Sequence, residues 1–105
     1  MDAATLARRY FEMWNTGDTG AVAELLAPEW VDHAHPEVTG PESVAGSVRA
    51  IRAARPGLRF EIESVLADAD RAAVVGSAGP ARLVWLFTVR DGRLADLRTF
   101  RDTTA

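Results

Sequence analysis

Two kinds of hydrophobic pattern divide this 105-residue chain, with helical spacing in the first half and strand-like alternation in the second. Residues 3–15 place apolar side chains three and four positions apart, which is typical of one face of a helix. A shorter helix is predicted between Asp18, as its N-terminal cap, and Pro28, and a third between Thr39 and Arg55. Because helices and strands are segregated along the chain, the pattern predicts an α+β fold.

Strand signals then follow one another to the end of the chain. Residues 58–63 alternate apolar and charged side chains, and residues 72–77 form a short run of small residues. Residues 83–89 are apolar on both faces, so we expect a central strand or one covered by an interface. Asp91-Gly92 predicts a tight hairpin turn, and the last strand is expected from Leu94 to about Asp102.

Composition narrows the class of protein. With 48% hydrophobic and 26% charged residues, the chain reads as one globular domain over residues 1–105. It has no apolar run long enough for a membrane span and no basic cluster that would indicate nucleic acid. The absence of cysteine excludes disulfides and thiol catalysis and fits a cytoplasmic location. Arginine without lysine indicates a high-GC bacterial genome and excludes a lysine Schiff base.

The two histidines of the chain lie in one short segment, residues 30–36. If this segment is extended, His33 and His35 share one face, and Trp30 and Asp32 share the other. Imidazole titrates near neutral pH, so a histidine here suits a general base; the structural alternative is a buried histidine bonded to backbone. Asp32 is expected to cap or pair locally. A metal site would need a third ligand, and we expect none.

Five short motifs occur in a fixed order along the chain. They are Tyr10 with Trp14-Asn15-Thr16-Gly17-Asp18, Trp30-Val31-Asp32-His33, Gly40-Pro41-Glu42, Arg55-Pro56-Gly57-Leu58 and Arg90-Asp91-Gly92-Arg93-Leu94. In this order they resemble the SnoaL-like polyketide cyclases of the nuclear-transport-factor-two-like superfamily. The resemblance implies a cone-shaped α+β fold, with three N-terminal helices packed on a curved antiparallel sheet around an apolar pocket. It also implies no cofactor.

The resemblance assigns a place to several side chains. It puts His33 in the pocket, where the similar ketosteroid isomerases hold a carboxylate base, and it makes His33 the catalytic candidate. Matching the terminal hairpin points these side chains inward: Leu83, Trp85, Phe87, Leu97, Thr99 and Arg101. The opposite register, with Arg98 and Asp102 inward, stays open because a one-residue slip exchanges the faces. The acidic residue that the cyclases carry late in this strand corresponds to Thr99.

The substrate-binding candidates are mostly aromatic or lie on the inward faces. They are Tyr10, Trp14, His35, Trp85, Phe87, Leu97, Thr99 and Arg101. The aromatic members also have a structural interpretation, because a small domain needs them to fill its core. Arg101 either binds an anionic or enol oxygen or is simply solvated.

Three functions from different classes remain open. The first is a cofactor-independent cyclase or isomerase that removes a proton beside the carbonyl of a small apolar compound. The second is a binding domain of the same fold without catalysis. The third is an interaction module that uses the face of the sheet. We further expect a homodimer through that face, because Val84, Leu86 and Phe100 would otherwise expose apolar surface.

Overall fold

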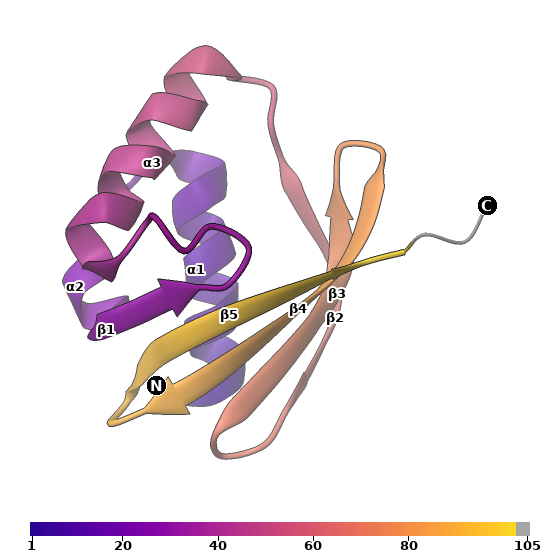
Figure 1. Ribbon diagram of the computed structural model, residues 1–105. Helices are drawn as coiled ribbons and strands as arrows, with labels where there is room; N and C mark the ends of the chain where they lie inside the picture. Colours follow the sequence, from indigo (N-terminus) through magenta and orange to yellow (C-terminus); the bar gives the residue numbers. More distant parts are fainter. Residues whose placement is uncertain (103–105) are drawn as a thin grey trace.

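The computed structural model describes residues 1–102 and has its three helices on one side of a twisted, curved sheet (Figure 1). The elements follow the predicted helices-then-strands order, with one early strand. They are α1 (Ala3–Thr16), α2 (Val22–Leu25), β1 (Leu26–Asp32), α3 (Gly40–Ala54), β2 (Phe60–Ala67), β3 (Arg71–Ala78), β4 (Ala81–Arg90) and β5 (Arg93–Arg101). The predicted α+β class is confirmed.

Helix α1 has a defined signal at each end. The Asp2 carboxylate caps its N-terminus by accepting a 2.8 Å hydrogen bond from the backbone N–H of Thr5. At the other end Gly17 adopts the left-handed conformation with φ of 79°, and its N–H donates to the Met13 carbonyl at 2.8 Å. Glycine is the residue that adopts this backbone without strain. The helix therefore ends where the Asn-Thr-Gly motif predicted.

The prediction for the second helix was partly wrong. Helix α2 is a single turn, and Leu26 and Pro28 belong to β1 instead. Asp18 does not cap the helix, because its carboxylate accepts the N–H of Gly20 at 3.0 Å and the N-cap is Ala21. Pro28 falls within the register shift between Leu26 and Val31, where an irregular strand tolerates the missing N–H.

The five strands of residues 1–102 form one sheet in the order β1-β5-β4-β3-β2. Three neighbouring pairs are antiparallel, as predicted, but β1 runs parallel to β5 at its edge, with Asp32 opposite Leu97. The expectation of a wholly antiparallel sheet was therefore wrong for β1. A parallel pair needs a long crossover, and here α3 and three strands lie between β1 and β5.

The last hairpin turns at Asp91 and Gly92, with φ of 53° and 78°, as the Asp-Gly signal predicted. It pairs Trp85 with Thr99 and Phe87 with Leu97. These four residues point toward the helices, so the preferred register is confirmed. The other register is wrong, since Phe100 is 53% exposed on the outer face.

The core lies between α1 and the inner face of the sheet. Its aromatic centre joins Tyr10 and Phe11 of α1 to Phe87 of β4, with ring centroids 5.2 and 5.8 Å apart, respectively. Phe11 also packs 4.6 Å from the Trp85 ring. Among residues 1–102, no helix is long and apolar enough to cross a membrane.

Candidate functional site

An apolar cavity of about 440 Å³ opens between α1, α3 and the inner face of the sheet. Every element except α2 and β3 contributes to its wall. The lining residues are Tyr10, Phe11, Trp14, Trp30, Asp32, Ala34, His35, Glu37, Val38, Val44, Ser47, Ile51, Arg55, Leu58, Phe60, Leu83, Trp85, Leu97 and Thr99. A cavity of this size, with aromatic and aliphatic walls and a few polar side chains, is typical of a small-molecule site.

Trp30 forms part of the inner wall and is 1% exposed. Its ring lies 5.5 Å from that of Tyr10. The indole N–H of Trp30 is buried and has no hydrogen-bond partner within residues 1–102. Buried donors are nearly always paired, so this N–H is an unusual unpaired donor in the wall of the cavity.

Tyr10 brings a hydroxyl group into the same wall. Burial raises the pKa of this hydroxyl far above its ordinary value, because the anion would lose its hydration. A hydrogen-bonding interaction with Trp14 lowers that pKa by less, and the negative charge of Asp32 raises it further. The hydroxyl therefore remains protonated and lies within the electrostatic reach of Asp32.

Asp32 places a carboxylate in this largely apolar surrounding. It ends β1, where its backbone pairs with Leu97, and its side chain is partly buried. One carboxylate oxygen, Oδ1, accepts the N–H of Ala34 at 3.0 Å. That bond fixes the side chain at the start of a turn. The predicted local role of Asp32 is thus real, but the same side chain also lines the cavity.

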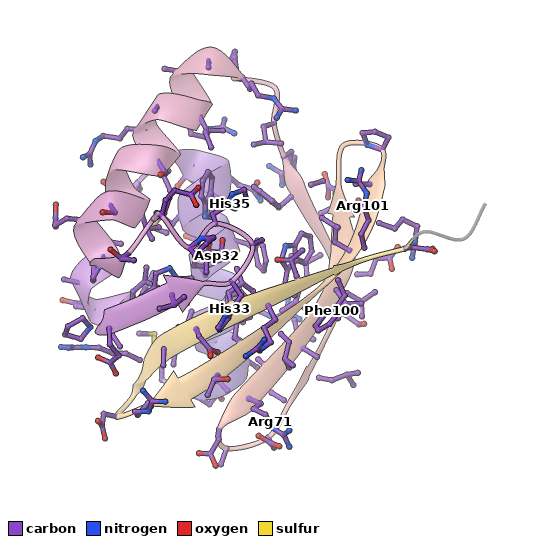
Figure 2. All side chains as sticks on the ribbon, in the orientation of Figure 1. Asp32, His33, His35, Arg71, Phe100 and Arg101 are labelled. Atoms are coloured by element: carbon purple, nitrogen blue, oxygen red, sulfur yellow. The ribbon has the colours of Figure 1, made fainter. Side chains whose placement is uncertain are left out.

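His33 does not face the cavity, and the predicted orientation was wrong. Its side chain is 38% exposed, and Nε2 lies 3.3 Å from Oδ2 of Asp96 on the outer side of β5. Figure 2 shows His33 beside β5, whereas Asp32 and His35 lie between α3 and the sheet. The reason is alternation: Trp30 must be buried, so Asp32 shares its inward face and His33 is turned outward.

His35 lines the mouth of the cavity, because a turn breaks the strand after Asp32. The N–H of His35 donates to the Asp32 carbonyl at 3.0 Å, and the N–H of Val38 donates to His35 at 3.0 Å. The prediction that the two histidines share one face of an extended segment was therefore wrong. The His35 imidazole lies 3.7 Å from the Glu37 carboxylate, and both side chains are about two-thirds exposed.

The remaining predicted binding residues divide into two groups. Tyr10, Trp14, Trp85, Leu97 and Thr99 line the cavity, as His35 does. Phe87 points inward but is fully buried in the core beneath the cavity, so the side chain is structural.

Arg101 lies outside the cavity wall. It is exposed at the end of β5, opposite Leu83, so the solvated alternative is the correct one for Arg101. No group of three or more metal-ligating side chains is present in the part of the chain that the structure describes.

Several wall residues were not predicted. The most important for chemistry are Asp32 and Trp30, together with Ser47 of α3 and Arg55, which follows the last residue of that helix. A simple signal would have found the first two, because the bulky Trp30 marks the buried face of its strand. Ser47 and Arg55 carry no comparable signal, since the cavity covers only part of α3.

Together, the fold and cavity define a small α+β pocket protein whose curved sheet, covered by helices, encloses an aromatic site. The family model for the SnoaL-like domain matches residues 7–97, so the chain belongs to the SnoaL-like family. No curated protein matches the chain at a significant level.

Solved structures share this fold over nearly the whole chain. A putative polyketide cyclase from Sinorhizobium meliloti is 25% identical, with a TM-score of 0.77, covering 91% of this chain and 94% of its own. A nuclear-transport-factor-two-like protein of unknown function from Mesorhizobium loti is 26% identical, with a TM-score of 0.74, covering 95% and 90%. A SnoaL-like polyketide cyclase from Agrobacterium tumefaciens has a TM-score of 0.77 at 14% identity, covering 98% and 93%.

Proposed function

We propose that this protein is a cofactor-independent isomerase or cyclase that moves a proton on a small apolar carbonyl compound. The observation that carries the proposal is the Asp32 carboxylate, which lines an aromatic cavity beside the buried Tyr10 hydroxyl. A base and a neutral hydrogen-bond donor facing one apolar space are the two groups that enolisation requires.

In the proposed reaction, Asp32 removes a proton from the carbon next to the carbonyl. The electron pair of the broken C–H bond forms the enolate, and its negative charge collects on the carbonyl oxygen. Protonated Asp32 then returns the proton to a second carbon in an isomerisation. In a cyclisation, the enolate carbon instead attacks a second carbonyl carbon of the same molecule. The π bond of that carbonyl breaks and leaves an alkoxide, and protonated Asp32 gives its proton to the alkoxide to form the alcohol.

Two donors can stabilise the enolate oxygen. The Tyr10 hydroxyl stays protonated because burial raises its pKa, so it can donate a hydrogen bond throughout the reaction. The unpaired indole N–H of Trp30 is the second donor in the same wall. The 25% identical protein from Sinorhizobium meliloti, described as a putative polyketide cyclase, supports the proposed reaction class.

A binding domain without catalysis is the second candidate, and one observation favours it. Asp32 already accepts the Ala34 N–H, which shows that the carboxylate has a structural task in the turn. Under this alternative, Asp32 would hold the turn and the cavity would only retain its ligand.

A paired ligand and turnover screen separates these candidates. Polyketide, steroid and terpenoid ketones are tested for thermal stabilisation and for conversion, with wild type and Asp32→Asn. Asparagine retains the oxygen that accepts the Ala34 N–H, so the turn is preserved. We expect the same ketones to stabilise both proteins and only wild type to convert them. Stabilisation of both without conversion by either would establish the binding domain.

We further propose that the protein forms a homodimer through the outer face of the sheet. Leu66 and Phe100 are 67% and 53% exposed there, and Val84 pairs with Phe100 across β4 and β5. Arg82 and Glu63 flank this apolar area with an ion pair of 2.8 Å. An apolar centre with a charged rim is the usual composition of a two-fold interface.

A further inference from the structure

We propose that Arg55 binds a carboxylate group of the ligand at the mouth of the cavity. The inference rests on the proposed function only in requiring that a ligand occupies the cavity. It adds the chemical class of that ligand: an apolar carbonyl compound with a carboxylate at one end. Arg55 acts here as a specificity-determining residue and takes no part in proton transfer.

Arg55 differs from its neighbouring arginines because its guanidinium has no partner within residues 1–102. Arg52 is occupied, donating to the backbone carbonyls of Leu58 and of Pro56, the latter at 3.2 Å. Arg59 pairs with Glu61 at 3.0 Å. These contacts hold the loop between α3 and β2. The guanidinium of Arg55, which lines the cavity, keeps its N–H donors available for a ligand. A planar guanidinium matches the two oxygens of a carboxylate.

The position of Arg55 along α3 gives the ligand an orientation. Ser47, Ile51 and Arg55 line the cavity at intervals of four residues, so they form one column on the same helix face. Ser47 and Ile51 are on the helix itself, and Arg55 follows its last residue at the exposed end. A ligand held by Arg55 would extend its apolar part along this column toward the aromatic wall.

The other charges at the mouth leave Arg55 available for an anion. Glu37, an exposed carboxylate that lines the cavity, lies 3.7 Å from the His35 imidazole. Asp32, the other carboxylate that lines the cavity, accepts the Ala34 N–H and is partly buried. Neither forms an ion pair with Arg55. A structural role for Arg55 is the alternative, because a cation near a helix C-terminus interacts favourably with the helix dipole.

A pair of probes with one aromatic frame tests this assignment. 2-Naphthoate carries a carboxylate, and 2-naphthamide is a neutral compound of nearly the same shape. Binding is followed by tryptophan fluorescence, since all three tryptophans of the chain line the cavity: Trp14, Trp30 and Trp85. We expect wild type to bind the carboxylate about tenfold or more tightly than the amide, because charge-assisted hydrogen bonds are roughly twice as strong as neutral ones.

Two variants locate the source of the preference. Arg55→Gln should lose it while binding the amide as wild type does. Arg59→Gln is the matched control, because Arg59 is exposed, paired with Glu61 and outside the cavity wall; it should keep the preference. Equal binding of both probes by wild type, or a preference that survives in Arg55→Gln, would overturn the assignment but leave the proposed reaction standing. If neither probe changed the fluorescence of wild type, the ligand cavity itself, and both proposals with it, would be contradicted.

Discussion

The side-chain amide of Asn15 forms two hydrogen bonds with the backbone of Phe60, joining the end of α1 to the start of β2. Its Nδ2 donates to the Phe60 carbonyl at 2.9 Å, and its Oδ1 accepts the Phe60 N–H at 2.8 Å. An amide mimics a neighbouring strand in this arrangement. Phe60 lines the cavity and packs 5.8 Å from the Trp14 ring, so Asn15 fixes one wall of the site.

The first prediction concerns this double contact. Asn15→Ala leaves a partly buried donor and acceptor unpaired, and we expect a loss of about 1–3 kcal/mol in the free energy of unfolding. Asn15→Asp keeps an acceptor for the Phe60 N–H but cannot donate to the carbonyl, so it should also destabilise the protein. Urea unfolding followed by far-ultraviolet circular dichroism measures both. An unfolding midpoint for Asn15→Ala equal to that of wild type would show that the contact is dispensable.

Replacing either of two glycines with alanine should change the free energy of unfolding, with opposite signs at the two positions. Gly46 lies inside α3 with space for a methyl group, so Gly46→Ala should stabilise the protein by about 0.5–1 kcal/mol. Gly92 has φ of 78° in the last hairpin, so Gly92→Ala should destabilise it by roughly 1–2 kcal/mol. Thermal unfolding of the two variants beside wild type gives both signs in one experiment. Stabilisation by Gly92→Ala would contradict the turn geometry.

Acid stability should depend on the cap of α1. The hydrogen bonds from Thr5 hold the pKa of the Asp2 carboxyl below its ordinary value. A carboxyl whose pKa is lower in the folded state stabilises the fold above its unfolded-state pKa, and this contribution disappears as the pH falls through the folded-state value. Asp2→Asn removes the titration. Its stability should therefore fall less steeply than that of wild type below about pH 4, as measured by urea unfolding across this range. If the stability of wild type and of Asp2→Asn fell equally steeply with pH, the stabilising role of the Asp2 cap would be contradicted.

The proposed dimer can be tested at one residue. Phe100→Asp puts a charge into the exposed apolar face, so it should shift the protein to the mass of one chain in light scattering at micromolar concentration. Phe100→Leu keeps the apolar character and should remain a dimer. A wild-type mass equal to one chain would contradict the proposal directly.

The order of elements could be predicted because it depends on local periodicity. Residues 3–15 and the Asp91-Gly92 turn carry their structure in the sequence itself, and α1 and the last hairpin form there. The faces of β4 and β5 also followed, because the aromatic residues Trp85 and Phe87 mark the buried side. The parallel pairing of β1 with β5 could not be predicted in this way, since it is a contact between distant segments.

The site was less predictable for a different reason. The histidine segment changes from strand to turn after Asp32, and this turn ends the alternation that would have kept His35 on the same face as His33. The outward side chain of His33 follows from the alternation itself, because Trp30 occupies the buried face. The prediction chose His33 because an imidazole titrates near neutral pH, but the burial of neighbouring residues decides which side chain reaches the cavity. Trp30 fixes that burial and therefore selects Asp32.

The central claim, that Asp32 removes a proton from a ketone in the cavity, is tested most directly by isotope exchange. The exchange of the α-protons of 2-tetralone in D₂O is followed by proton NMR with wild type, Asp32→Asn and His33→Asn. We predict catalysed exchange by wild type, a loss of about 10²–10⁴-fold in Asp32→Asn, and nearly unchanged exchange in His33→Asn, whose side chain lies outside the cavity. The claim would be contradicted if Asp32→Asn catalysed exchange as fast as wild type. It would also be contradicted if wild type did not exchange the α-protons faster than buffer alone.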